Sequence, residues 1–248
     1  MFSLDEVAIL RAETERCAKL DREEISRGPQ GEALFLWALE GYSDAFDTLL
    51  HDPRMVEPAK RLLGEDIYQH QLKVSCKPPG KGLDIPWHHD YDSWLRNDGM
   101  LEPGALNIAV YLDDVEADNG PLSFVPGSHR AGPDGQRLPT LHYDESGALF
   151  PVIEDEVLEP VIEKHGTLTP LAPAGSVVLF SDCIAHSSPP SESERTRHIV
   201  YLTFNRISNA LTHATRPWYM GNREPRRIDA GDRESLGRCR PGPPKRRA

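Results

Sequence analysis

The stretch IPWHHDYDSW, residues 85–94, holds two histidines and two aspartates within five positions. Imidazole nitrogens and carboxylate oxygens together form the ligand sets of many redox-active metal sites. If this segment is extended, His88 and Asp90 project to one side and His89 projects to the other. A His-x-Asp pair is short enough to recur by chance, so it indicates a metal site only when further ligands accompany it.

A third ligand and an anchor for a co-substrate can come from the second half of the chain. His186 follows an apolar run in VVLFSDCIAHSSP, at the point where a strand gives way to a polar turn. Two histidines and one carboxylate are the facial triad of non-haem iron(II) oxygenases, which leaves three positions open. Arg197 lies eleven residues after His186, and its planar guanidinium can bind a carboxylate through two hydrogen bonds. The ordered set predicts iron beside a site for a dicarboxylate.

Other residues compete for these roles. His89 and Asp92 form an alternative pair, although their spacing does not suit the alternation of a strand. Arg195 is the rival of Arg197. The same three ligands could also hold zinc in a hydrolase, but a hydrolase has no need of a dicarboxylate anchor. A jelly-roll binding module without a metal is a third alternative, and the intact ligand set is an argument against it.

The elements that must position these residues can be read from the flanking sequence. SLDE at residues 3–6 is a capping box, which predicts a helix to about Leu20. A second helix is predicted to begin with Asp52 as its N-cap and Pro53 at its first helical position, and to end at Gly64. Residues 67–77 then alternate between two faces, as a strand does. Four further strands are predicted in ALNIAVYLDD, PLSFVPG, GSVVLFSD and RHIVYLTFN.

Helices followed by scattered strands predict a single domain over residues 1–223, with a helical layer on a sheet sandwich or double-stranded barrel. Residues 130–170 are rich in Pro, Gly and charge, and we expect an insertion that acts as a lid. Residues 224–248 are dense in Arg and Pro, which predicts a flexible tail.

Composition limits the partners of the protein. The 248 residues carry 28 Lys and Arg against 39 Asp and Glu, a net charge of −11 that repels nucleic acid. The four cysteines are far apart and form no CxxC pair, which favours a reducing compartment. The N-terminus is too charged for a signal peptide, and no apolar run approaches the roughly 20 residues of a membrane span. We therefore expect a cytoplasmic protein that binds neither membrane nor nucleic acid.

Four stretches resemble the phytanoyl-CoA dioxygenase superfamily of iron(II)/2-oxoglutarate oxygenases: PWHHDYDSW, YLDDVEADNGPLSFVPGSHR, AGSVVLFSDCIAHSSP and RHIVYLTFN. The resemblance runs from about Asp52 to Trp218 and is greatest to the bacterial ectoine hydroxylase type. It implies a mainly β fold, a double-stranded β-helix of the cupin-like jelly-roll kind with flanking helices. It implies that His88, Asp90 and His186 bind Fe(II) and carry the catalysis.

The resemblance also implies the residues that bind 2-oxoglutarate. Arg197 and Ser188 match positions that hold its distal carboxylate. Lys77 matches a lysine of the ectoine hydroxylase pattern, and Ser75 stands where that pattern has an asparagine. For the substrate, Gln71 falls on the strand that lines the cavity of the family.

Trp94 matches a tryptophan near the substrate pocket of the ectoine hydroxylase group. The implied reaction consumes dioxygen and 2-oxoglutarate, with ascorbate as reductant in vitro, and gives succinate, carbon dioxide and a hydroxylated small molecule. The carboxylate of Asp90 argues against halogenation, which needs a small residue at that place. The acidic charge argues against a CoA thioester and favours an amino acid, a derivative of one or a natural-product intermediate.

Some alternatives stay open within the resemblance. The same iron centre could perform desaturation, cyclisation or epoxidation instead of hydroxylation. From the family alone we expect a monomer or a homodimer.

Overall fold

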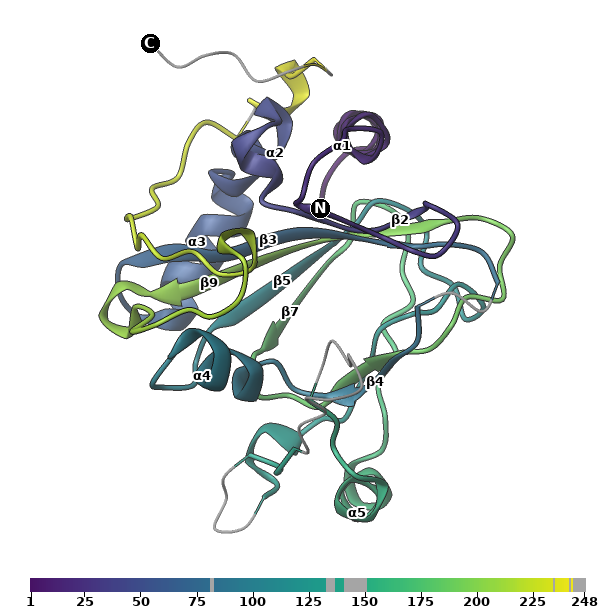
Figure 1. The fold of residues 1–248 in the computed structure, drawn as a ribbon, viewed down its shortest axis with the longest axis vertical. Helices are drawn as coiled ribbons and strands as arrows, with labels where there is room; N and C mark the ends of the chain where they lie inside the picture. The colour runs from purple at the N-terminus through teal and green to yellow at the C-terminus, as the bar shows by residue number, and fades with distance from the viewer. Residues whose placement is uncertain (81–82, 133–136, 141–150, 234, 241, 243–248) are drawn as a thin grey trace.

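Two antiparallel sheets form the body of the molecule, and the computed structural model describes residues 1–80, 83–132, 137–140, 151–233, 235–240 and 242. The larger sheet has the order β1 (Ile25–Arg27), β2 (Ala33–Trp37), β3 (Ile67–Lys77), β9 (Arg197–Arg206), β5 (Leu106–Tyr111) and β7 (Val177–Ser181). The smaller sheet has the order β4 (Ile85–His88), β8 (His186–Ser188) and β6 (Ser123–Phe124). Figure 1 shows the larger sheet crossing the molecule, with β4 of the smaller sheet below it. The predicted jelly-roll with flanking helices is confirmed.

Three helices lie on the outer face of the larger sheet: α1 (Leu4–Ala18), α2 (Asp44–Leu50) and α3 (Pro53–Leu63). The predicted capping box is present, because the Ser3 side chain accepts from the Glu6 amide and the Glu6 carboxylate accepts from the Ser3 amide. Asp52 caps α3 by accepting from the Arg54 amide, and Gly64 ends it in the left-handed region at φ 78°. Both predicted helices are therefore confirmed.

The main hydrophobic core lies between these helices and the larger sheet. Met55 of α3 and Phe46 of α2 are fully buried against Leu72 of β3 and Leu202 of β9. Short 3₁₀ turns connect the elements: η1 (Leu39–Gly41), η2 (Ser128–Arg130), η4 (Ile207–Asn209), η5 (Trp218–Met220) and η6 (Leu236–Arg238). Within the part of the chain that the structure describes, no helix is both long and apolar enough to span a bilayer. The opposite face of the larger sheet faces the smaller sheet.

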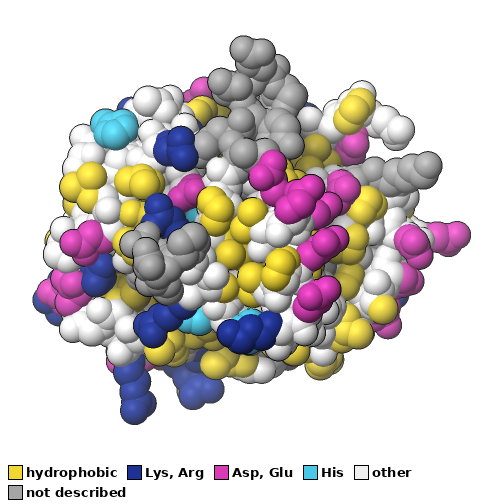
Figure 2. Space-filling model, turned by 90° about the horizontal axis from the view of Figure 1, so that it is seen from below, with side chains coloured by type: hydrophobic (Ala, Val, Ile, Leu, Met, Phe, Trp, Pro, Cys, Tyr) yellow, Lys and Arg dark blue, Asp and Glu magenta, His cyan; other side chains and the backbone are white. Residues whose placement is uncertain are grey.

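Three of the described helices were not predicted: α2, α4 (Tyr91–Asp98) and α5 (Asp155–His165). α5 lies in the segment predicted as a lid, and it packs Leu158 and Val161 against Val125. Residues 133–136 and 141–150 of that segment are outside the described residues. Figure 2 views the molecule from below Figure 1 and shows acidic side chains gathered on one half of that face. The described part of the segment is therefore a packed helix with exposed acidic residues on its surface.

The described residues of the C-terminal segment, 224–233, 235–240 and 242, are packed against the rest of the molecule. The Ile228 amide donates to the Ile67 carbonyl, and the Gly231 amide donates to the His51 carbonyl. Leu236 is fully buried in the main core. The composition of the segment suggested a solvated tail, but a few apolar side chains and backbone hydrogen bonds are enough to hold it on the helical layer, at the top of Figure 1.

Candidate active site

Three side chains with metal-binding atoms converge between the two sheets. His88 ends β4 and His186 begins β8, and the two are direct partners in the antiparallel ladder. Their ring centroids are 4.2 Å apart. The Asp90 oxygens lie 3.8 Å from Nε2 of His88 and 3.8 Å from Nε2 of His186. One ligand atom from each residue lies within 4.8 Å of the other two, which is the spacing that one shared cation requires.

The sequence-based explanation that an extended segment brings His88 and Asp90 together is wrong. Asp90 is not extended, because its φ and ψ are −72° and −33° and it stands at the N-terminus of α4. The chain turns there, and the turn brings the carboxylate back toward the histidines. His89 is buried elsewhere, with Nε2 within 2.9 Å of the Leu138 carbonyl, and it is not part of the ligand group among the described residues.

Backbone contacts set the orientation of both imidazoles. Nδ1 of His88 lies 2.8 Å from the Pro86 carbonyl, and Nδ1 of His186 lies 3.0 Å from the Ile184 carbonyl. A carbonyl can only accept, so each Nδ1 carries a proton, which leaves Nε2 as the ring atom that can bind a metal. Burial lowers the pKa of His88 to about 3, with the neighbouring His186 acting in the same direction. The ring is therefore neutral and able to donate to a metal at neutral pH.

The Asp90 carboxylate is ionised in this environment. Burial acts to raise its pKa, but its neighbours, led by His186, His88 and Lys73, lower it by more. Two imidazole nitrogens and one carboxylate oxygen are a ligand set suited to Fe(II). The donor chemistry and its spacing thus fit the metal that the resemblance implied.

Two adjoining pockets open at the ligand group, and Phe35, Lys73, His88 and Asp90 line both of them. The first is also lined by Gln71, Ser93, Trp37, Trp94, Pro151, Arg216 and Met220. The second is also lined by Ser75, Ile85, Asn107, Leu122, Phe180, His186, Ser187, Ser188 and Tyr201. The structure therefore places Gln71 and Trp94, predicted for the substrate, in the first pocket and Ser75 and Ser188, predicted for the co-substrate, in the second.

Arg197 lies beyond the second pocket with a buried and partly unpaired guanidinium. Its side chain is 1% exposed, Nη2 donates to the Gly120 carbonyl at 2.9 Å, and Nη1 has no hydrogen-bond partner among the described residues. Leaving a buried charged donor unpaired is costly, so this atom fits an anionic ligand. The single hydroxyl hydrogen of Ser188 is already donated to Gly120. Burial raises the pKa of Tyr201 on the pocket wall, and Arg197 opposes that rise.

The binding of the co-substrate by Lys77 stays a prediction, and the ammonium is occupied by protein contacts in this structure. The Lys77 ammonium donates to the Ser188 carbonyl, the Ser188 hydroxyl and the Pro189 carbonyl, which accounts for its three hydrogens. Lys77 is completely buried and lines neither pocket. Its hydrogen bonds tie the end of β3 to the chain at the end of β8.

Sequence reasoning missed Lys73, which lies on the same face of β3 as Gln71 and Ser75. Lys73 lines both pockets, and no hydrogen bond or ion pair from its ammonium to another described residue is present. The ammonium stands 5.1 Å from the ring centroid of Trp37 and 5.5 Å from that of Tyr201. Burial lowers its pKa, and the Asp90 charge opposes that effect. The alternation of the strand was the signal that could have identified it.

Arg216 is the second cation that the sequence did not reveal. Its guanidinium pairs with Asp98, at 3.0 Å from Nε to Oδ1 and through a second contact from Nη2, and Nη2 also donates to the Met220 carbonyl. Asp98 is fully buried at the end of α4. Gln71 donates to the Met220 carbonyl at 2.6 Å, so β3 and α4 together hold the segment 216–220 against the first pocket.

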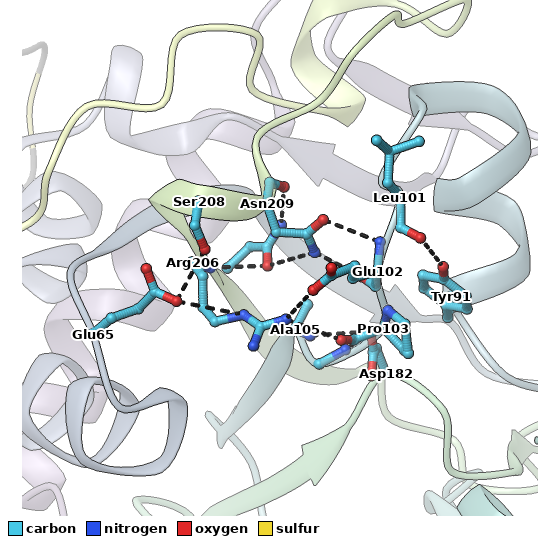
Figure 3. Close-up of polar contacts among 12 residues, drawn as sticks. Glu65, Tyr91, Leu101, Glu102, Pro103, Ala105, Asp182, Arg206, Ser208 and Asn209 are labelled. Carbon is cyan, nitrogen blue, oxygen red and sulfur yellow. Dashed lines mark hydrogen bonds and ion pairs between the residues drawn. The ribbon is translucent and has the colours of Figure 1, made fainter. Parts of the chain in front are cut away.

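A polar network fixes the loop between α4 and β5, which connects two walls of the site. The buried Asp182 carboxylate accepts from the Gly104 and Ala105 amides, at 2.9 and 3.0 Å, and Asn209 bonds both the amide and the carbonyl of Glu102. Figure 3 shows these contacts together with the ion pair of Arg206 to Glu102. The Asp182 carbonyl also accepts from the amide of Tyr91, the residue after Asp90. The start of α4 and the start of β5 are therefore held by one residue.

Comparison with known proteins gives a consistent result. A family model described as phytanoyl-CoA dioxygenase (PhyH) matches residues 1–199. L-proline trans-4-hydroxylase of Streptomyces griseoviridis is 33% identical over 227 residues, which are 88% of this chain and 85% of that protein. Ectoine dioxygenase of Sphingopyxis alaskensis is 32% identical over 240 residues, 90% of this chain and 77% of that protein.

Solved structures agree with this result. EctD from S. alaskensis with bound Fe superposes with a TM-score of 0.80 at 30% identity, over 93% of this chain and 80% of that one. The same enzyme with 2-oxoglutarate and 5-hydroxyectoine gives a TM-score of 0.78 at 29% identity, over 94% and 80% of the two chains. The carbocyclase SnoK, at 18% identity and a TM-score of 0.67 over 100% and 87%, shares the fold.

Proposed function

Since the chain belongs to the phytanoyl-CoA dioxygenase family, we propose that His88, Asp90 and His186 hold the Fe(II) of a 2-oxoglutarate-dependent hydroxylase. The observation that carries the proposal is the convergence of the three ligand atoms within 4.8 Å, beside a buried arginine with an unpaired nitrogen. When bound, Fe(II) with 2-oxoglutarate and dioxygen supplies an oxidation that gives succinate and carbon dioxide and places one oxygen atom on a substrate carbon.

We assign the second pocket to 2-oxoglutarate. Ser188 and Ser75 line the walls of this pocket. Arg197 lies behind Ser188, which it contacts through Nη2, and we propose that its unpaired Nη1 meets the distal carboxylate. Lys73 takes the place predicted for Lys77, because its ammonium faces the pocket near Tyr201. It would bind the carboxylate that lies closer to the metal.

We assign the first pocket to the substrate, with Gln71 and Trp94 among its walls. Arg216 lines this pocket, and because its Nε and Nη2 are paired with Asp98, we propose that its Nη1 meets a carboxylate on the substrate. Trp37 and Trp94 give the pocket aromatic surface. An amino acid or a cyclic derivative of one has both features.

Turnover with two related compounds tests this assignment. The protein is incubated with Fe(II), 2-oxoglutarate, ascorbate and either L-proline or ectoine, while succinate and product mass are measured. We expect one compound to stimulate succinate release and to gain one oxygen atom. L-prolinamide is the matched control if L-proline is active, because it keeps the ring and lacks the carboxylate. Equal activity with the amide would contradict a carboxylate site at Arg216, and a product that has lost two hydrogens would indicate desaturation.

We further propose that the enzyme acts in the cytoplasm on a small molecule as a monomer or homodimer, without nucleic acid. Its four cysteines, Cys17, Cys76, Cys183 and Cys239, are all free thiols in the structure, which suits a reducing compartment. The acidic charge supports the exclusion of nucleic acid.

A further inference from the structure

A chain of two hydrogen bonds leads from the larger sheet to the Asp90 carboxylate. Asn107 of β5 and Thr203 of β9 are direct partners across the two strands. The Thr203 hydroxyl donates to Oδ1 of Asn107 at 2.7 Å, and Nδ2 of Asn107 donates to Oδ2 of Asp90 at 2.8 Å. Asn107 is 3% exposed and Thr203 is 1% exposed. Both side chains of the relay are therefore almost completely buried, and Asn107 also lines the second pocket.

The directions of the two bonds depend on each other. An ionised carboxylate can only accept, so Asn107 must present its amide nitrogen to Asp90 and its oxygen to Thr203. The Thr203 hydroxyl can donate or accept, so the carboxylate selects the amide orientation, and the hydroxyl donates to the amide oxygen that this orientation turns toward β9. Thr203 thereby anchors Asn107 in the orientation that holds Asp90.

Asp90 depends on this contact for its orientation. It stands at the N-terminus of α4, yet its side chain makes no capping bond to that helix. Among the described residues, Asn107 is the one whose side chain donates a hydrogen bond to Asp90. Asn107 also interrupts the apolar sequence LNIAVY of β5, which is buried along its whole length. A buried amide in such a strand is costly unless it is paired.

We propose that Asn107, oriented by Thr203, is a positioning residue that fixes the rotation of the Asp90 carboxylate for metal binding. The inference rests on the proposed Fe(II) site and extends it to two residues outside the ligand set. Hydrogen-bonded partners of metal ligands typically contribute about 10- to 100-fold to metal affinity or activity. Both residues should therefore affect the affinity for the metal before any substrate is present.

The test is a titration of the metal-free protein with Co(II) alone, followed by its visible spectrum and by calorimetry. We expect Asn107→Ala to weaken Co(II) binding about 10- to 100-fold. Thr203→Val, which removes the hydroxyl at nearly constant volume, should weaken it by a smaller factor and alter the spectrum of the bound ion. Thr203→Ser keeps the donor and should restore the affinity and the spectrum.

Thr14→Val is the matched control, because Thr14 is equally buried and donates one hydrogen bond to the Leu10 carbonyl on α1, away from the site. It should change stability without changing Co(II) affinity. Wild-type affinity in Asn107→Ala and Thr203→Val would overturn the inference, as would equal losses in Thr203→Ser and Thr203→Val. If the wild type binds Co(II) but forms no succinate from 2-oxoglutarate, the proposed function fails while the positioning inference is still decided by the titration.

Discussion

At the scale of single residues, the two lysines of β3 show how position on one strand separates two roles. Lys73 and Lys77 share a face of the strand, but Lys73 opens into both pockets while Lys77 gives its three hydrogens to Ser188 and Pro189. The Lys73 ammonium can bind a ligand without breaking a hydrogen bond to the described protein, and the Lys77 ammonium cannot. The difference is made by residues that lie more than 100 positions away in the sequence.

Substitution of each lysine by methionine should separate these roles. A hydrogen bond to a charged group contributes about 1.5–3 kcal/mol, so Lys73→Met should raise the KM for 2-oxoglutarate by about 10- to 100-fold with little change in thermal stability. Lys77→Met leaves buried carbonyl oxygens unpaired and should lower the free energy of unfolding by about 1–3 kcal/mol. Succinate kinetics and urea unfolding measure the two effects. The opposite pattern, with the larger KM change in Lys77→Met, would return the co-substrate role to Lys77.

The ligand triad could be predicted from residue types and spacing, because two histidines and an aspartate beside an arginine form a constrained chemical set. The choice between Lys73 and Lys77 could not be predicted from the sequence, since strand alternation places both lysines on one face of β3. Asn107 and Arg216 could not be identified either, because their roles depend on contacts between elements distant in the chain. A buried Asn in an apolar strand was the available signal for Asn107.

At the scale of elements, capping residues and alternation predicted α1, α3 and most strands, since these signals are local. The helix α4 was not predicted because it is short and directly follows the metal-binding segment, which was interpreted as extended. The pairing of β4 with β8 places His88 opposite His186, and no local pattern could show that register. α5 was missed because charge and an internal proline obscured the helical pattern.

At the scale of the whole molecule, the C-terminal segment is part of the helical layer. Leu236 is fully buried against the main core, and η6 lies beside α1 and α2. In Figure 1 this contact is at the end of the molecule away from β4, which carries His88. The segment therefore contributes to stability and is separate from the site.

Leu236→Ala should destabilise the fold without affecting the metal site. Truncation of a buried leucine typically costs about 2–5 kcal/mol, so the free energy of unfolding in urea should fall by that order while Co(II) affinity stays at the wild-type value. Leu101→Ala is the control, since Leu101 is 63% exposed and its loss should change stability little. No destabilisation in Leu236→Ala would mean that the segment is the flexible tail that its composition suggested.

Conversion of 2-oxoglutarate to succinate, compared between the wild type and Asp90→Ala, tests the account most directly. The reaction needs Fe(II) bound at the triad, so the wild type should release succinate only with added Fe(II), and Asp90→Ala should release none above background. Calorimetric Fe(II) titration without oxygen should show one site in the wild type and its loss in the variant. Undiminished succinate formation by Asp90→Ala would contradict the site described between β4 and β8.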